Sequence, residues 1–209
     1  MGLPQPQTLW TVDEYLAFER EAFGRHEYLD GQILAMAGEK LPHGQVTVNL
    51  VIVVGMQLKG TPCQALTKDT KVRSGPTPLP RSRQRSKMRP SFAGLFSYLD
   101  LVIVCGEPAF HDEEQDVILN PTAIAEVLSN STEAFDRGEK FTRYQTWNPT
   151  LREYLLIAQD QPQIEHFSRQ KTGWSYQRYA GLKSILVIPS IHVVLKLADV
   201  YDRVKLKKA

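Results

Sequence analysis

The pattern of apolar and polar positions along the chain predicts an α/β protein. Two runs are almost entirely apolar, which is typical of strands covered on both faces: residues 98–105 and 122–128. Shorter runs predict further strands at 63–68, near Val72, and at 151–157, 164–168 and 174–179. Amphipathic or apolar stretches predict helices at 12–24, 44–59 and 136–147. We therefore expect one α/β domain, residues 1–209, with a mixed sheet.

Two local signals set boundaries near the amino terminus. Thr11 and Glu14 form a capping-box pattern, in which each side chain binds the other's backbone N–H, so a helix begins at Val12. The dipeptide Asp30-Gly31 supplies the positive φ angles that tight hairpin turns require. A short helix followed by a β-hairpin is therefore predicted there.

Two further segments are less clear. Residues 44–59 are rich in β-branched side chains, which favours a strand, but their length and the following Gly60 favour a helix. We interpret this segment as a helix. Asp136 and Glu139 indicate the capped start of another helix, which runs to about Trp147.

Length and composition exclude several classes of protein. The chain has 209 residues, 42% hydrophobic and 23% charged, which rules out wholesale disorder, collagen and a coiled-coil rod. Its longest aliphatic run, residues 50–54, is far shorter than the roughly 20 residues that span a bilayer. Cys63 and Cys105 are too few for a disulfide framework or a four-thiolate zinc site. We expect a cytoplasmic protein without membrane association.

The net charge of +2 hides a concentration of positive charge in one segment. Residues 71–97 hold seven basic side chains and no acidic one, so the remainder of the chain is net negative. Residues 74–97 also contain four prolines, which predicts a loop. Such a loop is either a solvated surface or a contact for nucleic-acid phosphates. The residues that would bind nucleic acid are Arg81, Arg83, Arg85, Lys87 and Arg89.

Three charged residues occupy positions where the pattern calls for apolar ones. Asp100 shares a predicted strand face with Val102 and Val104, and Glu126 lies on the face of a second apolar strand. A buried carboxylate without a partner costs several kcal/mol or becomes protonated. One divalent cation could stabilise both carboxylates, and oxygen ligands suit Mg²⁺ or Mn²⁺.

Lys140 lies at the edge of the predicted buried stripe of its helix, on the side that would face the sheet. Two carboxylates, a lysine and a metal ion are suited to cleaving a phosphodiester. A purely structural role for these residues stays open, because isolated acidic residues at strand ends are often exposed or salt-bridged, and lysines extend to solvent.

Motifs of nucleotide-dependent enzymes and serine hydrolases are absent from the sequence.

The sequence resembles the Uma family of bacterial restriction endonucleases, within the PD-(D/E)XK nuclease superfamily. The matching segments occur in order over roughly residues 9–204: 25–31, Pro42-His43, 98–108, Asn120-Pro121, 126–129, 131–140, Tyr144 and 153–157. The resemblance implies a restriction-endonuclease-like fold, a mixed central sheet flanked by helices, and metal-dependent cleavage of DNA. The sequence departs from the family or superfamily pattern at three positions: Leu99 replaces a proline, Leu128 stands where the superfamily has lysine, and Asn130 replaces a frequent proline.

The resemblance also implies roles for individual residues. Asp100 and Glu126 would bind Mg²⁺ or Mn²⁺, and Lys140 would be the catalytic lysine that replaces the missing one. Glu27 would be an additional catalytic acid, although a surface carboxylate at a strand start is an equal alternative. His43 matches a family histidine, which we interpret as a helix-start or packing residue.

Two functions are consistent with these observations. The first is a Mg²⁺-dependent endodeoxyribonuclease that uses Asp100, Glu126 and Lys140. The second is a non-catalytic DNA-binding or dimerising protein on a decayed nuclease scaffold, which Leu99 and the basic loop would favour. No sequence pattern specifies an oligomeric state, but related nucleases pair to cut both strands, so a homodimer is one expectation.

Overall fold

A computed structural model describes residues 9–76 and 93–206 of the chain. The α-helices are α1 (Val12–Glu21), α2 (Leu41–Leu58), α3 (Glu133–Phe135), α4 (Phe141–Trp147) and α5 (Leu197–Val200). The strands are β1 (His26–Leu29), β2 (Gln32–Ala35), β3 (Cys63–Leu66), β4 (Lys71–Ser74), β5 (Leu95–Tyr98), β6 (Leu101–Cys105), β7 (Val117–Ile118), β8 (Ala123–Leu128), β9 (Glu153–Ala158), β10 (Gln163–Arg169), β11 (Trp174–Ala180), β12 (Ile185–Ile188) and β13 (Val193–Lys196). A π-helical turn (Asp136–Lys140) joins α3 to α4, and a 3₁₀ turn (Pro189–Ile191) precedes β13.

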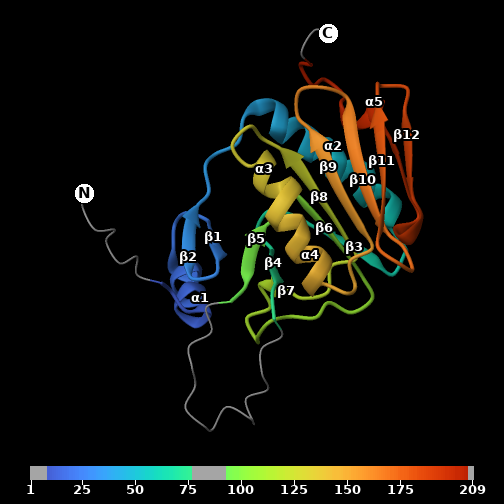
Figure 1. The fold of residues 1–209 in the computed structure, drawn as a ribbon. Helices are drawn as coiled ribbons and strands as arrows, with labels where there is room; N and C mark the ends of the chain where they lie inside the picture. The colour runs from blue at the N-terminus through green and yellow to red at the C-terminus, as the bar shows by residue number, and fades with distance from the viewer. Residues whose placement is uncertain (1–8, 77–92, 207–209) are drawn as a thin grey trace.

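The central sheet is mixed and has helices on both faces. Its strand order is β11-β10-β9-β8-β6-β3, with β8 parallel to β9 and antiparallel to β6. In Figure 1, α4 lies in front of this sheet and α2 lies behind it. The predicted α/β architecture, a mixed sheet flanked by helices, is confirmed.

Side chains of β8 alternate between the two helical layers, as a pleated strand requires. Ala125 and Val127 belong to the apolar cluster that contains Val46 and Leu50 of α2. Ile124 and Leu128 point the other way, into the cluster that contains Phe141 and Tyr144 of α4. Glu126 has the same parity as Ile124 and Leu128, so its side chain enters the layer between the sheet and α4.

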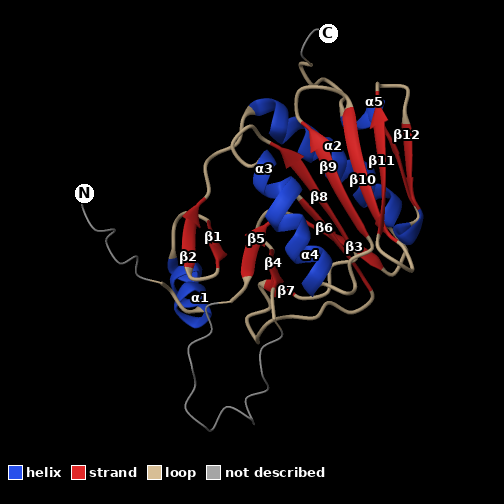
Figure 2. Cartoon of the chain, in the orientation of Figure 1, coloured by secondary structure: helices blue, strands red, loops and turns tan. Residues whose placement is uncertain are grey.

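A second sheet lies at one side of the molecule, with strand order β2-β1-β5-β4-β7 (Figure 2). Tyr15 of α1 stacks against Tyr28 of β1 and contacts Phe96 of β5 in the core between α1 and this sheet. The capping box of Thr11 and Glu14 is present, which confirms the predicted helix start. The hairpin turn is also confirmed, since Asp30 and Gly31 have φ angles of 45° and 95°.

The prediction of one strand over residues 98–105 is wrong. The chain leaves the second sheet after Tyr98, turns at Leu99 and Asp100, and enters the central sheet at Leu101. The predicted loop at 74–97 is also too long, because strand structure continues to Ser74 and resumes at Leu95. The apolar pattern could not reveal the break, because both strands are buried and the residue between them, Leu99, is buried too.

The predicted helix start at Asp136 is likewise wrong. Helical structure begins at Glu133, so Asp136 lies inside the helical segment, where the backbone widens into the π-helical turn. The Asp136 side chain is buried and forms an ion pair with Lys140 instead of capping the helix. An acidic residue near a helix start indicates a cap only when its side chain stays near free backbone N–H groups.

Helix α2 confirms the helical interpretation of residues 44–59, and begins earlier than predicted, at Leu41. Its length and apolar composition are sufficient to cross a membrane, a property that core helices share. Its inward face, which includes Val46, Leu50 and Val54, packs into the core of the central sheet. The arrangement is that of a helix covering a sheet.

The two cysteines lie on neighbouring strands, a relationship that the sequence did not predict. Cys63 of β3 is directly opposite Cys105 of β6, and their sulfur atoms form a disulfide. The bond links the edge strand of the central sheet to the strand that follows Asp100.

Candidate active site

Glu126 and Lys140 form a buried ion pair between the central sheet and the helix that covers it. The ammonium nitrogen of Lys140 lies 2.6 Å from Oε1 of Glu126, and both side chains are buried. Glu126 comes from β8, and Lys140 is the last residue of the π-helical turn. Such turns are frequent at functional sites, because they displace side chains from regular helical positions.

Two further carboxylates surround the same ammonium group. Glu27 of β1 and Asp136 each lie 3.4 Å from the nitrogen of Lys140. Burial lowers the pKa of Lys140, but the three carboxylates outweigh burial and raise this pKa well above its usual range. Lys140 therefore carries its positive charge at neutral pH. It cannot act as a base, but it can stabilise negative charge.

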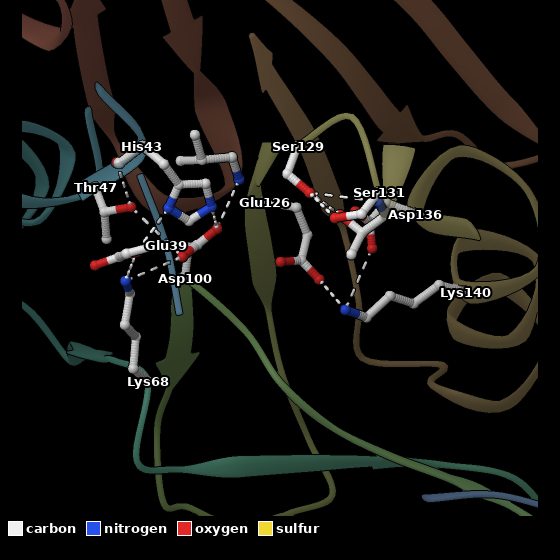
Figure 3. A network of polar contacts seen from close by, with 12 residues as sticks. Glu39, His43, Thr47, Lys68, Asp100, Glu126, Ser129, Ser131, Asp136 and Lys140 are labelled. Carbon is white, nitrogen blue, oxygen red and sulfur yellow. Dashed lines mark hydrogen bonds and ion pairs between the residues drawn. The ribbon is translucent and has the colours of Figure 1, made fainter. Parts of the chain in front are cut away.

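Burial and neighbouring charges act in opposite directions on the pKa of Glu126. Burial raises its pKa well above the usual range, Lys140 opposes this rise, and the charges of Asp136 and Asp100 add to it. Figure 3 shows one carboxylate oxygen of Glu126 pointing toward Lys140 and the other lying on the side of Asp100. A positive charge added beside that second oxygen would favour the ionised carboxylate.

Asp100 lies at the turn between β5 and β6, where its side chain is held from several directions. Its Oδ2 accepts a hydrogen bond from the backbone N–H of Val127 at 2.8 Å, which attaches it to the strand of Glu126. Because Leu101 pairs with Ala125, Asp100 lies beside Glu126 in the continuing register.

The other partners of Asp100 come from α2 and from the loop after β3. His43 Nε2 lies 3.3 Å from its Oδ2, and the Thr47 hydroxyl and Lys68 ammonium lie 3.4 and 3.7 Å from its Oδ1. Burial raises the pKa of Asp100, but His43, the Val127 N–H and Lys68 outweigh burial and lower it. The Asp100 carboxylate is therefore ionised.

Glu39 completes this side of the site. It accepts a hydrogen bond from His43 Nδ1 at 2.7 Å and forms an ion pair with Lys68 (Figure 3). One ligand atom each from Glu39, His43 and Asp100 lies within 4.8 Å of the other two, a spacing that allows a shared metal ion. A groove of about 380 Å³ opens beside them and is lined in part by Glu39, Thr47 and Lys68.

The structure brings together the four predicted catalytic residues, Asp100, Glu126, Lys140 and Glu27. His43 lies in the first turn of α2, as expected, but its ring contacts Asp100 rather than packing in the core. The predicted nucleic-acid contacts Arg81, Arg83, Arg85, Lys87 and Arg89 lie outside the described residues. Leu99, which replaces the superfamily's proline, is buried in the core next to the site.

Sequence reasoning missed Glu39 and Lys68 as members of the site. A signal for Glu39 existed, because it stands four residues before His43, a spacing that brings side chains together at a helix start. Lys68 follows β3 in a loop, and nothing in its local sequence distinguishes it from the other lysines of the chain.

Comparisons with known proteins agree with this architecture. The family model of Uma2, described as "Putative restriction endonuclease", matches residues 12–198. A crystal structure described as a "putative nuclease belonging to DUF820", from Anabaena variabilis ATCC 29413, is similar with a TM-score of 0.67 and 14% identity, covering 92% of this chain and 97% of that one. At that identity the likeness concerns the fold.

Two curated relatives come from Synechocystis sp. (strain ATCC 27184 / PCC 6803 / Kazusa). The uncharacterized protein sll1609 is 33% identical over 165 residues, which cover 78% of this chain and 81% of the relative. The uncharacterized protein slr1290 is 30% identical over 190 residues, which cover 88% and 90% of the two chains. The family model spans most of the chain and both relatives are at least 30% identical to it, so the chain belongs to the Uma2 family, described as "Putative restriction endonuclease".

Proposed function

We propose that this protein is a metal-dependent endonuclease that hydrolyses DNA phosphodiester bonds. The observation that carries the proposal is the buried pair of Glu126 and Lys140 beside the ionised Asp100. Burying three ionisable side chains next to one another costs folding free energy, so their presence together points to a chemical role. The family and the fold support a nuclease.

The residues present fit a divalent cation. Five carboxylates surround the site and outnumber its two ammonium groups and one imidazole: Glu27, Glu39, Asp100, Glu126 and Asp136 against Lys68, Lys140 and His43. The donors nearest the centre, Asp100 and Glu126, offer the hard oxygen atoms that Mg²⁺ and Mn²⁺ prefer. A divalent ion bound there would polarise a phosphate oxygen and lower the pKa of water.

The side chains of the protein would stabilise the transition state and position the reacting groups. Lys140, held charged by its three carboxylates, would stabilise the negative charge that develops on the phosphate in the transition state. Glu27 contacts the same ammonium group and would fix its position. Asp136 would contribute in the same way from within the helix. The hydrogen bond from the backbone N–H of Val127 would keep Asp100 directed toward Glu126.

The basic segment would supply affinity for DNA. Residues 81–89 hold five cationic side chains and connect β4 to β5, the strand that leads directly to Asp100. Each phosphate contact would release counterions, so binding would weaken steeply with salt. If all five contact phosphates, their replacement by Ala would reduce the slope of log affinity against log salt by about 4.5.

We propose also that the active form is a homodimer, since cutting both DNA strands requires two sites. Val48, Ile52 and Met56 lie on successive turns of α2 and are 57, 57 and 66% exposed. Helix α2 contains no Asp, Glu, Lys or Arg, so two copies could pack these faces together without opposing like charges. Light scattering of wild type and Ile52→Glu tests this: a dimer that becomes a monomer supports it, and a monomeric wild type contradicts it.

The nuclease proposal is tested by plasmid cleavage in Mg²⁺ or Mn²⁺. We expect cleavage by wild type, none in chelator, and a loss of at least about 100-fold in Glu126→Gln and in Lys140→Met. The exposed residues Glu113 and Lys59 provide charge-matched controls, Glu113→Gln and Lys59→Met, which should cleave normally. Full activity in both site variants would contradict the assignment. DNA binding without cleavage by wild type would favour the non-catalytic scaffold.

A further inference from the structure

The imidazole of His43 lies between two carboxylates, one on each ring nitrogen. Nδ1 is 2.7 Å from Oε2 of Glu39, and Nε2 is 3.3 Å from Oδ2 of Asp100. A neutral imidazole has only one N–H group. Whichever nitrogen carries the hydrogen, the other presents a lone pair to a carboxylate oxygen. Two facing acceptors repel each other, so the ring needs a cation between the two carboxylates, and that cation is either a second proton or a metal ion on one of the nitrogens.

The geometry identifies which side that cation would occupy. The shorter contact, to Glu39, has the length of a strong hydrogen bond to a charged acceptor. The longer contact, to Asp100, is long for such a bond. Its length agrees with the separation of about 3.0–3.5 Å between two ligand atoms that each lie about 2.1 Å from one metal ion.

A histidine with a carboxylate on one ring nitrogen is a common arrangement in metal centres. A histidine that binds a metal through one nitrogen donates its other N–H to a carboxylate, which fixes the ring and makes it a better ligand. Glu39 stands in that position relative to His43, and Lys68 in turn pairs with Glu39. Lys68 also approaches Asp100, so positive charge is already favoured between the two carboxylates.

We propose that His43 Nε2 and Asp100 are direct ligands of a transition-metal ion such as Mn²⁺, and that Glu39 orients the imidazole through Nδ1. The inference deepens the proposed function, because Asp100 is also a ligand there. The groove lined by Glu39, Thr47 and Lys68 lies beside the proposed ligands. The Lys68 side chain is 29% exposed and can move aside as the ion enters.

A histidine ligand has a consequence for the choice of metal. Imidazole nitrogen binds transition metals well, whereas Mg²⁺ prefers oxygen ligands and water. His43 would therefore favour Mn²⁺ over Mg²⁺ at a site that otherwise consists of carboxylates. Replacing it with a residue that offers only oxygen or a weak nitrogen should reduce this preference.

The test measures metal binding by the full chain without DNA. Calorimetric titration of Mn²⁺ should show binding that weakens about 10–100-fold in His43→Asn and by a similar factor in Glu39→Gln. Affinity for Mg²⁺ should change less in the same variants. The control is His192→Asn, because His192 is exposed and Asn tolerates its positive φ of 54°.

A spectroscopic measurement separates ligation from a general loss of stability. Pulsed EPR of bound Mn²⁺ should detect coupling to an imidazole nitrogen in wild type and in His192→Asn, and none in His43→Asn. Nitrogen coupling that persists in His43→Asn, equal Mn²⁺ affinity in the two histidine variants, or no Mn²⁺ binding by wild type would overturn the inference. Nuclease activity is measured independently, so cleavage with unchanged metal binding in His43→Asn would reject this inference and leave the proposed function standing.

Discussion

The ammonium group of Lys140 lies 2.6 Å from the carboxylate of Glu126, and both side chains are buried between the central sheet and its covering helix. Removal of one member of a buried pair leaves the partner's charge without compensation, which destabilises a protein more than the pair itself stabilises it. The two members are not equivalent, because Lys140 has two further partners, Glu27 and Asp136.

This inequality gives a prediction for stability. Lys140→Met should lower the free energy of unfolding by about 3 kcal/mol, because it leaves three carboxylates close together without a cation. Glu126→Gln should cost about 1 kcal/mol, because Lys140 keeps Glu27 and Asp136. Urea unfolding of both variants at neutral pH, in chelator, checks the order. Equal losses, or a larger loss in Glu126→Gln, would contradict this account of the pair.

Acid should weaken a second ion-pair cluster, which attaches α1 to the loop before β7. Asp116 pairs with Arg20 at 2.8 Å and with Lys71 at 2.9 Å. Burial alone would raise the pKa of Asp116, but the two cations outweigh burial and lower this pKa from 3.8 to about 2. A folded-state pKa below the unfolded one means that the stabilisation is present above pH 3.8 and is lost as the pH falls toward 2.

The matched variant is Asp116→Asn. At pH 6 it should be less stable than wild type by about 1 kcal/mol, a value reduced for solvent screening because Asp116 is partly exposed. The difference should shrink toward zero as the pH falls from 4 to about 2. Urea unfolding across that range measures it. A difference that stays constant with pH would show that the ion pairs do not stabilise the fold.

The sequence revealed those features that depend on neighbouring residues. The capping box at Thr11 and the hairpin turn at Asp30-Gly31 are set by local backbone chemistry, so a few residues suffice to recognise them. Glu126 was recognisable because it interrupts an apolar strand, and Lys140 because it lies at the edge of the predicted buried stripe of its helix. Of the side chains around them, Glu27 was expected only through the family resemblance, and Asp136 was taken for a helix cap.

Features that depend on distant contacts were not predictable in this way. Nothing near Asp100 shows that the chain changes sheets there, because both adjoining strands are buried. Asp136 has the local sequence of a helix cap, but its side chain is buried and forms an ion pair with Lys140. His43 meets Asp100 only because α2 crosses behind the central sheet, an arrangement that the packing of the whole core determines.

The disulfide between Cys63 and Cys105 should contribute to stability under oxidising conditions. It closes a loop with a sequence separation of 42 residues, for which chain entropy gives a stabilisation of about 2–4 kcal/mol. Reduction of wild type should therefore lower its unfolding midpoint in urea. The Cys63→Ser/Cys105→Ser variant should have the same midpoint with and without reductant. A wild type that is equally stable in both conditions would contradict the prediction.

The central claim is that Asp100 and Glu126 hold a divalent cation beside Lys140. The most direct measurement is an anomalous difference map from a crystal of the full chain soaked in Mn²⁺. We predict an anomalous peak in contact with carboxylate oxygens of both Asp100 and Glu126. Peaks confined to other parts of the surface, or the absence of any peak at these two carboxylates, would contradict it.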